Sequence, residues 1–464
     1  MERIISNETA PNQGEYIKHI KLKNIDCDKK AMIVTYGCAQ NETDSDKLYG
    51  MLFEMGYTRA QNPDDANLII FNTCSVRENA EIKVYGKIGA LKAKKKKKDS
   101  LIIGICGCLM QQGHASEKIR KSFPFVDMIF GTHAIHNFPQ LLYETMQTRK
   151  NIMDVEQTDG FIAEGVPTYY GKKYKASIPI VLGCNNFCTY CVVPLTRGRE
   201  RSRNSRDILA EIERLCQNGL KEVTLLGQNV NSYGNKGDLD FPDLLLEIAK
   251  IDSIKRIRFL TSHPKDLTDK LIQTMAGCDK ICKSLHLPFQ AGNNRILKEM
   301  NRKYTREDYL ALVEKIKTAM PNIALTADVI VGFPGETDQE FLDTMDIVEK
   351  VRFDTLFTFI YSRRKDTKAA LMEDHRTHEE KLSNFNVLLE TQTRICKEIN
   401  DTYVGNLYEI IDEGISKTNL NMRHGRTETN KIINYKAKSE INEGDFVKVR
   451  VTESMSWSLN GVEA

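Results

Sequence analysis

The stretch SIPIVLGCNNFCTYC, residues 177–191, joins a short apolar run to three cysteines spaced C-x3-C-x2-C. The apolar part, 177–182, predicts a strand, and Cys184, Cys188 and Cys191 follow it on one tight loop. A zinc finger needs a fourth ligand nearby, and the next 24 residues contain no Cys or His. Three thiolates alone fit a [4Fe–4S] cluster in which one iron has no protein ligand and can chelate a substrate.

This strand opens a series of alternating strands and helices. The expected strands are 177–182, 222–227, 256–261, 281–287, 323–332 and 355–362. The expected helices between them are 205–218, 242–250, 266–276, 293–300, 306–319 and 338–350. A charged amphipathic helix follows at 371–400. Six consecutive units favour a partial (β/α)6 barrel over residues 177–398, with its chemistry at the C-terminal ends of the strands.

Residues 31–145 predict a separate α/β domain. Apolar runs at 31–37, 67–74, 101–108 and 126–132 predict strands, and helical patterns lie between them, including a lysine-rich one at 78–98. Alternation of this kind predicts a parallel sheet covered by helices. The flanking segments are expected to be a polar, loosely ordered tail at 1–30 and a linker at 146–176.

Residues 399–464 have a different sequence pattern, with short segments of alternating residues in place of helical periodicity. YEIIDEG (408–414), KIINYKAK (431–438) and DFVKVRVTE (445–453) are short alternating segments separated by Gly and Asn. This pattern predicts a small OB-like β-barrel at the C-terminal end.

A second set of cysteines follows the strands of the N-terminal domain. Cys38, Cys74 and Cys108 each come just after a predicted strand. Because the C-terminal ends of parallel strands meet at one edge of a sheet, the three thiolates are expected to lie together. Such a set suits an iron–sulfur cluster or a zinc ion with an open position. We interpret the other six cysteines as structural or incidental: Cys27, Cys106, Cys216, Cys278, Cys282 and Cys396.

Composition sets the cellular context and limits the electrostatics. The chain has 464 residues, 41% of them hydrophobic, and a formal charge of +3. No apolar run approaches the ~20 residues that a spanning helix needs. We therefore expect a cytoplasmic protein without a membrane segment, whose clustered thiols bind metal. The near-zero charge gives no global argument for nucleic-acid binding, and 401–464 is slightly acidic, with eight basic and ten acidic residues.

Around GCNNFCTYC (183–191) the sequence resembles the radical S-adenosylmethionine (SAM) superfamily, and the flanking motifs narrow the resemblance to its methylthiotransferases. Motifs similar to that family's N-terminal domain are TYGCAQNETDS (35–45), FNTCSVRENA (71–80) and GCLMQ (107–111). Motifs similar to its central barrel are GCNNFCTYCVVPLTRGRERSR (183–203), LLGQNVNSYG (225–234), TSHP (261–264), LHLPFQAGNNRILKEMNRKY (285–304) and DVIVGFPGET (328–337). The closing β segment resembles a TRAM domain, an RNA-binding OB-like barrel.

The resemblance implies two [4Fe–4S] clusters and SAM as co-substrate. Cys184, Cys188 and Cys191 would hold the cluster that binds SAM and cleaves it reductively. The 5′-deoxyadenosyl radical would abstract hydrogen from C-2 of N6-isopentenyladenosine at position 37 of tRNA. A second SAM would supply the methyl group, which leaves as methylthio from an auxiliary cluster on Cys38, Cys74 and Cys108. In such reactions the cofactor carries out the chemistry, and the protein binds and positions it.

Other candidate contacts lie at the predicted catalytic face or in basic stretches. A Gly-rich strand end, VIVGFPGE (329–336), lets the backbone approach a ligand closely. The cofactor contacts expected are Tyr190, Gln228, Asn229, Gln290, Asp328, Gly332 and Gly335. Arginine can pair with phosphates or stack on a splayed base. Two arginine-containing stretches are therefore candidate RNA contacts: RGRERSRNSR (197–206) and MRHGR (422–426), of which the second is expected as a loop. The RNA contacts expected are Arg197, Arg199, Arg201, Arg203, His263, Arg423 and Arg426. No general base is assigned.

The expected partners are a tRNA anticodon stem-loop carrying N6-isopentenyladenosine and an electron donor such as flavodoxin or ferredoxin, acting on a monomer. One alternative keeps the chemistry but acts on N6-threonylcarbamoyladenosine in tRNA or on an aspartate of a ribosomal protein. Another is a non-catalytic iron–sulfur RNA-binding protein. The chain also departs from the family pattern, since YSRRKDT (361–367) stands where a YSPRPGT-like turn is usual, and ESMSWSLNG (453–461) lacks the small residues expected in a last barrel strand.

Overall fold

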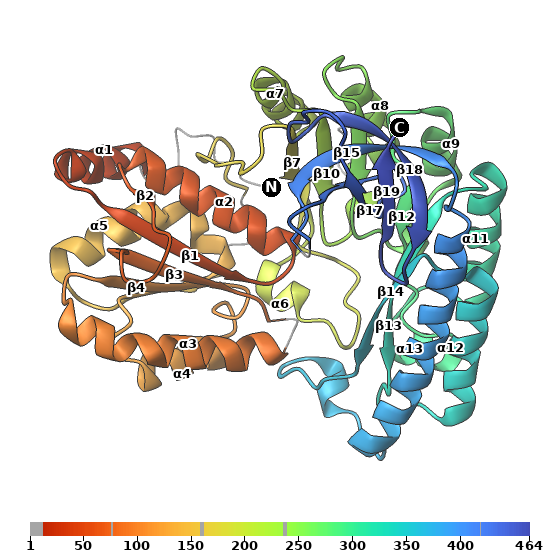
Figure 1. The fold of residues 1–464 in the computed structure, drawn as a ribbon. Coiled ribbons are helices and arrows are strands. Elements are labelled where there is room, and N and C mark those ends of the chain that lie inside the picture. Colours follow the sequence, from red (N-terminus) through yellow and green to blue (C-terminus); the bar gives the residue numbers. More distant parts are fainter. Residues whose placement is uncertain (1–12, 76–77, 158–161, 235–238, 418) are drawn as a thin grey trace. The chain divides into compact units, whose positions relative to one another are not determined.

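The structure, a computed structural model, describes residues 13–464 apart from 76–77, 158–161, 235–238 and 418 (Figure 1). The chain divides into two compact units. The first comprises 1–171 with 181–185 and 191–203, and the second comprises 172–180, 186–190 and 204–464. None of the described helices is both long and apolar enough to cross a bilayer.

The first unit contains a six-stranded parallel sheet in the order β2-β1-β3-β4-β5-β6. Its strands are β1 (Lys30–Tyr36), β2 (Thr58–Arg59), β3 (Leu68–Thr73), β4 (Ile102–Gly107), β5 (Met128–Phe130) and β6 (Ile152–Asp154). Its helices are α1 (Gln13–Asn24), α2 (Ala39–Glu54), α3 (Glu78–Lys97), α4 (Gly113–Ser122), the 3-10 turn η1 (Thr132–Asn137), α5 (Phe138–Thr148) and the short α6 (Val193–Arg197). The predicted α/β domain is therefore confirmed.

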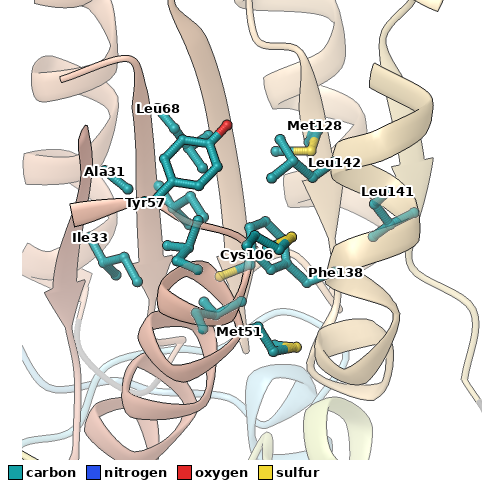
Figure 2. Packing of buried hydrophobic residues seen from close by; sticks show 14 of the residues in the cluster. Ala31, Ile33, Met51, Tyr57, Leu68, Cys106, Met128, Phe138, Leu141 and Leu142 are labelled. Carbon is teal, nitrogen blue, oxygen red and sulfur yellow. The ribbon is translucent and has the colours of Figure 1, made fainter. Parts of the chain in front are cut away.

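Both faces of this sheet are buried, as continuous apolar strands require. Residues of β3 and β4 alternate between two hydrophobic clusters, so Ile70 and Cys106 pack on one face and Ile69 and Ile105 on the other. Figure 2 shows the first cluster, in which Cys106 lies near Phe138 of α5. The burial confirms Cys106 as a core residue.

Two predictions at the edges of this domain are wrong. Part of the expected tail forms α1, because Ile20 is completely buried and the Asn24 side chain donates a hydrogen bond to the Met55 carbonyl at 2.9 Å. Part of the expected linker is β6, which pairs with β5 and extends the sheet. Residues 1–12 and 158–161 of these two segments lie outside the described residues.

The second unit contains the predicted partial barrel. Its parallel strands form two three-stranded sheets, β11-β10-β7 and β12-β13-β14, linked by a bridge between Ile257 and Ile281. The strands are β7 (Lys175–Pro179), β10 (Glu222–Leu226), β11 (Arg256–Phe259), β12 (Ser284–His286), β13 (Ala324–Val331) and β14 (Thr355–Ile360). The helices are α7 (Ser205–Cys216), α8 (Phe241–Ala249), α9 (Asp269–Gly277), α10 (Asn294–Glu299), α11 (Arg306–Ala319), α12 (Asp338–Val351) and α13 (His378–Asp401). Two capping boxes fix the starts of α11 and α12.

The turn after β14 keeps a left-handed residue despite its unusual sequence. Asp366 has φ +68°, at the position where the family pattern has glycine. Aspartate tolerates this conformation better than most side chains, so the departure at YSRRKDT does not remove the turn.

The C-terminal segment forms a closed barrel in the order β15-β16-β17-β19-β18. The strands are β15 (Leu407–Ile415), β16 (Arg423–Arg426), β17 (Ile432–Lys436), β18 (Phe446–Ser454) and β19 (Leu459–Glu463). The loop expected at 422–426 is thus a strand. The last strand forms although its sequence is atypical, because Gly461 admits the Arg450 carbonyl, which lies 2.6 Å from where a Cβ would stand.

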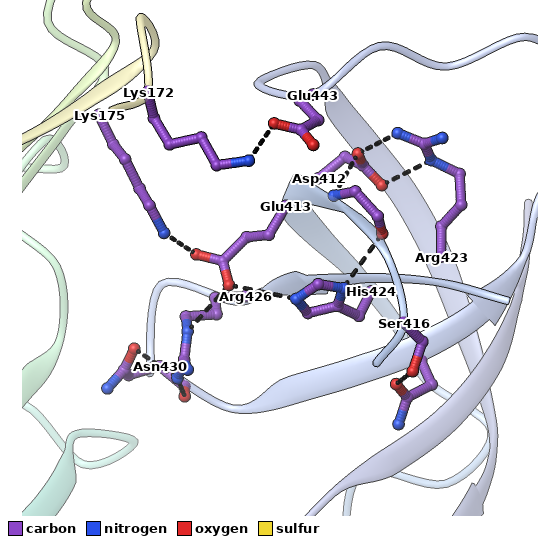
Figure 3. Close-up of polar contacts among 12 residues, drawn as sticks. Lys172, Lys175, Asp412, Glu413, Ser416, Arg423, His424, Arg426, Asn430 and Glu443 are labelled. Atoms are coloured by element: carbon purple, nitrogen blue, oxygen red, sulfur yellow. Dashed lines mark hydrogen bonds and ion pairs between the residues drawn. The ribbon is translucent and has the colours of Figure 1, made fainter. Parts of the chain in front are cut away.

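Acidic side chains inside the same unit form ion pairs with two arginines of this barrel (Figure 3). Asp412 is completely buried and binds Arg423, with Nε to Oδ2 at 3.0 Å. Glu413 binds Arg426 at 3.3 Å and Lys175 of β7 at 2.5 Å. Both guanidinium groups thus bind internal carboxylates, and the contact of Arg423 and Arg426 with RNA stays a prediction.

Replacing Asp412 with alanine should strongly destabilise the small barrel. Its carboxylate accepts hydrogen bonds from the Gly414 N–H at 2.9 Å and the Tyr435 hydroxyl at 2.7 Å, as well as from Arg423. Breaking a buried pair of this kind costs about 3–5 kcal/mol. Hydrogen exchange of the β15–β18 amides should show that loss in the free energy of local opening. Asp401→Ala, which breaks an exposed pair with Lys397, should cost under ~1 kcal/mol, and equal effects would contradict the assignment.

Candidate active site

Three neighbouring strands of the first unit end at the same level, each followed by a cysteine. The register pairs Tyr36 of β1 with Thr73 of β3, and Thr73 with Gly107 of β4. Cys38, Cys74 and Cys108 come one or two residues beyond these paired positions. The predicted convergence of the three cysteines at one edge of the sheet follows from this register.

A glycine and an asparagine pair shape this edge. Gly107 has φ +98°, and a Cβ there would stand 2.5 Å from the Thr73 carbonyl oxygen, so only glycine fits the turn that leads to Cys108. The Asn41 side chain donates to Asn72 Oδ1 at 3.0 Å, and Asn72 donates back to the Asn41 carbonyl at 2.8 Å. This reciprocal pair joins the first turn of α2, which begins just after Cys38, to β3.

The thiols of the set influence one another. Burial raises the pKa of Cys108 to about 11, the Arg197 guanidinium lowers it, and Cys74 and Cys38 raise it further. Within the described part of the chain, no group of three or more Cys, His, Asp or Glu side chains is arranged so that it could hold a metal ion. The chemistry of the donors nevertheless suits an iron–sulfur cluster, because Cys38 and Cys74 both act on the Cys108 thiol and all three follow neighbouring strand ends.

Arg197 is the cation at this edge. Its Nε lies 3.2 Å from Cys108 Sγ, and its Nη2 lies 2.7 Å from Asp44 Oδ2. Only 6% of Arg197 is exposed, so the structure gives it an internal role, and its contact with RNA stays a prediction.

The neighbouring arginines of the RGRER stretch are also mostly engaged. Arg201 is buried and donates to the Arg197 carbonyl at 2.8 Å, and Arg203 forms an ion pair with Glu164 at 2.6 Å. Arg199 is exposed, and its contact with RNA stays a prediction. The stretch looked like a basic surface patch, whereas most of it holds the local fold together.

The predicted SAM-cluster loop is held by backbone contacts in the first unit. Gly183 has φ +77°, and a Cβ there would clash with the Arg199 carbonyl. The Cys184 N–H donates to the Gly198 carbonyl at 3.3 Å, and Cys191 Sγ accepts from the Val193 N–H at 3.4 Å. Glycine at 183 is thus needed for a close backbone approach that turns the chain into the cysteine loop.

Cys188, which belongs to the second unit, has its own arginine. Arg302 lies with Nη1 3.5 Å from Cys188 Sγ and donates from Nη2 to the Pro288 carbonyl at 2.8 Å. Tyr190 packs, partly buried, against a small apolar cluster that includes Phe333. Sequence reasoning missed Arg302, although its place in the NRKY motif was a usable signal.

The rim residues predicted at the strand ends take up different roles. Asn229 is buried and donates to Asp266 at 2.7 Å, and Gln228 is half-buried. His263 is 5% exposed; burial, with Arg302 and Lys265, lowers its pKa to about 2, so its ring is neutral. Its contact with RNA stays a prediction.

Gln290, Gly332 and Gly335 lie at the ends of β12 and β13. Gln290 has φ +69° and bridges to Val329, a strained conformation of the kind that clusters at functional sites. Gly332 has φ +72° and packs on Lys381, whose Cγ lies 2.5 Å from where a Cβ would stand. Gly335 has φ +77° and lies in open surroundings, with Arg295 Nη1 3.9 Å away. Internal packing therefore explains Gly332 without a ligand.

One face of the last barrel strands carries polar and aromatic side chains. Asp328 of β13 is the register partner of Phe357 of β14. Both lie on the face of the sheet opposite to the one on which Ala327 and Val329 are buried. His286 lies beside both, with Nε2 3.6 Å from the Asp328 carboxylate and its ring 5.6 Å from that of Phe357. Phe357 and Phe359 on this face are 47% and 38% exposed, which is unusual for phenylalanine inside a barrel strand.

Comparison with known proteins places the chain. A radical SAM superfamily model matches residues 178–348, the uncharacterized protein family UPF0004 matches 30–131, and a TRAM domain model matches 401–462. A tRNA-2-methylthio-N(6)-dimethylallyladenosine synthase from Acetivibrio thermocellus is 52% identical over 98% of this chain and 97% of its own. The chain belongs to the radical SAM methylthiotransferase family. Membership implies a [4Fe–4S] cluster and SAM.

Other members of the methylthiotransferase family agree along their whole length. The enzymes of the same name from Alkaliphilus oremlandii and Clostridioides difficile are 50% and 48% identical, and each match covers at least 97% of both chains. Among solved structures, the radical SAM methyltransferase TsrM from Kitasatospora setae matches with a TM-score of 0.55 at 14% identity, over 74% of this chain and 77% of that one. That likeness supports the fold alone.

Gly107→Ala should remove the cluster held by Cys38, Cys74 and Cys108. The substitution meets the Thr73 carbonyl and forces a positive φ on alanine, a strain of about 1–3 kcal/mol that a shift of Cys108 relieves. Iron and sulfide analysis after anaerobic reconstitution should show about half the content of the unmodified protein. Gly113→Ala at the start of α4, where a Cβ meets nothing within 4 Å, should keep the full content. Full content in Gly107→Ala would contradict the prediction.

Proposed function

We propose that this protein methylthiolates C-2 of N6-isopentenyladenosine at position 37 of tRNA. The observation that carries the proposal is the pair of three-cysteine sets in a chain that matches named members of the family over at least 97% of their length. Cys38, Cys74 and Cys108 follow three neighbouring strands of the first unit whose last residues pair in register. Cys184, Cys188 and Cys191 lie in the segment that follows β7. Relatives of 48–52% identity carry the name of this activity.

The two sets would hold two [4Fe–4S] clusters. Cys184, Cys188 and Cys191 would hold the one that binds SAM, and Cys38, Cys74 and Cys108 the auxiliary one. When bound, these groups supply reductive cleavage of SAM and the sulfur for transfer. The chain itself contributes thiolate ligands and a buried arginine near one sulfur of each set, Arg197 near Cys108 and Arg302 near Cys188.

The exposed aromatic face of β14 supports a nucleoside substrate. Phe357 and Phe359 offer apolar surface to a purine ring or an isopentenyl chain. Asp328 and His286 stand next to Phe357 and can accept or donate hydrogen bonds to the edge of the base. This combination of stacking and edge contacts is how proteins read an unstacked base in RNA.

RNA recognition would rest on a few residues of the small barrel. With Arg423 and Arg426 in ion pairs, the remaining basic positions of this barrel include Lys436, Lys438 and Lys448. The slightly acidic segment 401–464 would then contribute to RNA binding through the positions of these lysines and the shape of the barrel, more than through its net charge. An electron donor such as flavodoxin or ferredoxin, a monomeric state and a cytoplasmic setting complete the proposal.

The activity is tested with the anaerobically reconstituted protein, reductant, SAM and anticodon stem-loop RNA carrying N6-isopentenyladenosine. We expect 5′-deoxyadenosine and a methylthio product on the RNA. Parallel reactions with threonylcarbamoyl-modified RNA and with a ribosomal protein should give neither above background. Product from one of these instead would move the activity to that substrate, and iron binding without SAM cleavage would contradict an enzymatic function.

Phe357→Ala should weaken use of the RNA while sparing SAM cleavage. Stacking of a base on an aromatic side chain is worth ~1–3 kcal/mol, so KM for the RNA should rise about tenfold. The ratio of methylthio product to 5′-deoxyadenosine should fall. Leu342→Ala on α12, a comparably exposed apolar side chain at 54%, should behave like the unmodified enzyme. Equal KM values for the two variants would remove β14 from the substrate site.

A further inference from the structure

Asp44 and Arg197 form a buried ion pair at the cysteine edge of the first unit. Their side chains are 6% and 7% exposed, and their charged atoms lie 2.7 Å apart. Asp44 lies on α2, six residues after Cys38, and Arg197 ends the short α6. A buried pair is not needed for stability, because apolar residues of similar volume often stabilise a fold as well or better.

The pair is connected to one of the predicted cluster ligands. Arg197 uses separate nitrogens for its two partners, with Nε at Cys108 Sγ, 3.2 Å away, and Nη2 at Asp44. A guanidinium group keeps its charge in proteins, so the sulfur of Cys108 receives a charge-assisted hydrogen bond.

Arg302 provides a contrast at the other cysteine set. It is also buried and donates to Cys188 Sγ at 3.5 Å, and its other partners are the Pro288 carbonyl and the Tyr304 hydroxyl. Among the described residues no carboxylate pairs with Arg302. Of the two arginines that contact a cysteine sulfur, only Arg197, at the Cys38, Cys74 and Cys108 set, has its positive charge paired with a carboxylate among the described residues.

We propose that Asp44 and Arg197 together set the reduction potential of the cluster on Cys38, Cys74 and Cys108. Hydrogen bonds to cluster sulfurs and nearby charge are the protein's means of moving such potentials. Arg197 favours the reduced cluster, which carries one more negative charge, and Asp44 opposes it. Both are positioning residues, and the inference rests on the proposed function only in that a [4Fe–4S] cluster occupies these cysteines.

The test uses the Cys184/Cys188/Cys191→Ala variant of the full chain, in which only this cluster remains. Its one-electron reduction by dithionite is followed by EPR at controlled potential. Asp44→Asn should shift the midpoint potential upwards, because it leaves the arginine charge uncompensated. Arg197→Gln should shift it downwards, because it leaves a buried carboxylate near the cluster. The double variant should return most of the way to the starting value.

Further variants separate this role from a structural one. Arg197→Lys keeps the charge and should lie between Arg197→Gln and the starting protein. Asp127→Asn breaks a half-buried pair with Lys95 just before β5, at the opposite end of the strands, and should leave the potential unchanged. Shifts of the same sign for Asp44→Asn and Arg197→Gln, or unchanged potentials with intact clusters, would overturn the inference. Failure of the starting protein to form any cluster would instead contradict the proposed function.

Discussion

The level register of β1, β3 and β4 is the constraint on which the first unit depends. Because the three strands are parallel neighbours and their last residues pair across the sheet, the residues that follow them meet at one edge. Both faces of the sheet are packed with apolar side chains, so a slip of one residue would move every side chain of a strand into the cluster on the other face and disrupt the packing of both. A rigid core of this kind holds the three thiols in place without a disulfide among them.

Charges buried near the cysteines are the second organising feature. The chain has 66 basic and 63 acidic residues, yet several arginines that look suited to RNA are used internally. Arg197 contacts Cys108 and Asp44, Arg203 pairs with Glu164, and Arg423 pairs with Asp412. Arginine suits such sites because its planar group can serve two partners at once and does not lose its charge on burial.

Much of the fold was predictable from the sequence, because strongly apolar strands and amphipathic helices repeat at regular intervals. The elements that were missed have weak local signals. The helix Gln13–Asn24 is mostly polar and buries only Ile20 and Asn24, while β6 is only three residues long. The strand Arg423–Arg426 contains no apolar side chain at all, and tertiary pairing with β15 and β17 creates it.

The cysteine positions were predictable because strand ends converge in any parallel sheet, whereas the partners of polar side chains were not. Asp44, His286, Arg302 and Phe357 come from segments far apart in the chain, and only the fold brings each to its partner. The central claim is that each cysteine set carries its own cluster. Mössbauer spectroscopy of 57Fe-reconstituted protein tests this most directly. The unmodified chain should show two [4Fe–4S] clusters, and replacing either set by alanine should leave one. A single cluster in the unmodified chain, or the loss of both on replacing one set, would contradict the account.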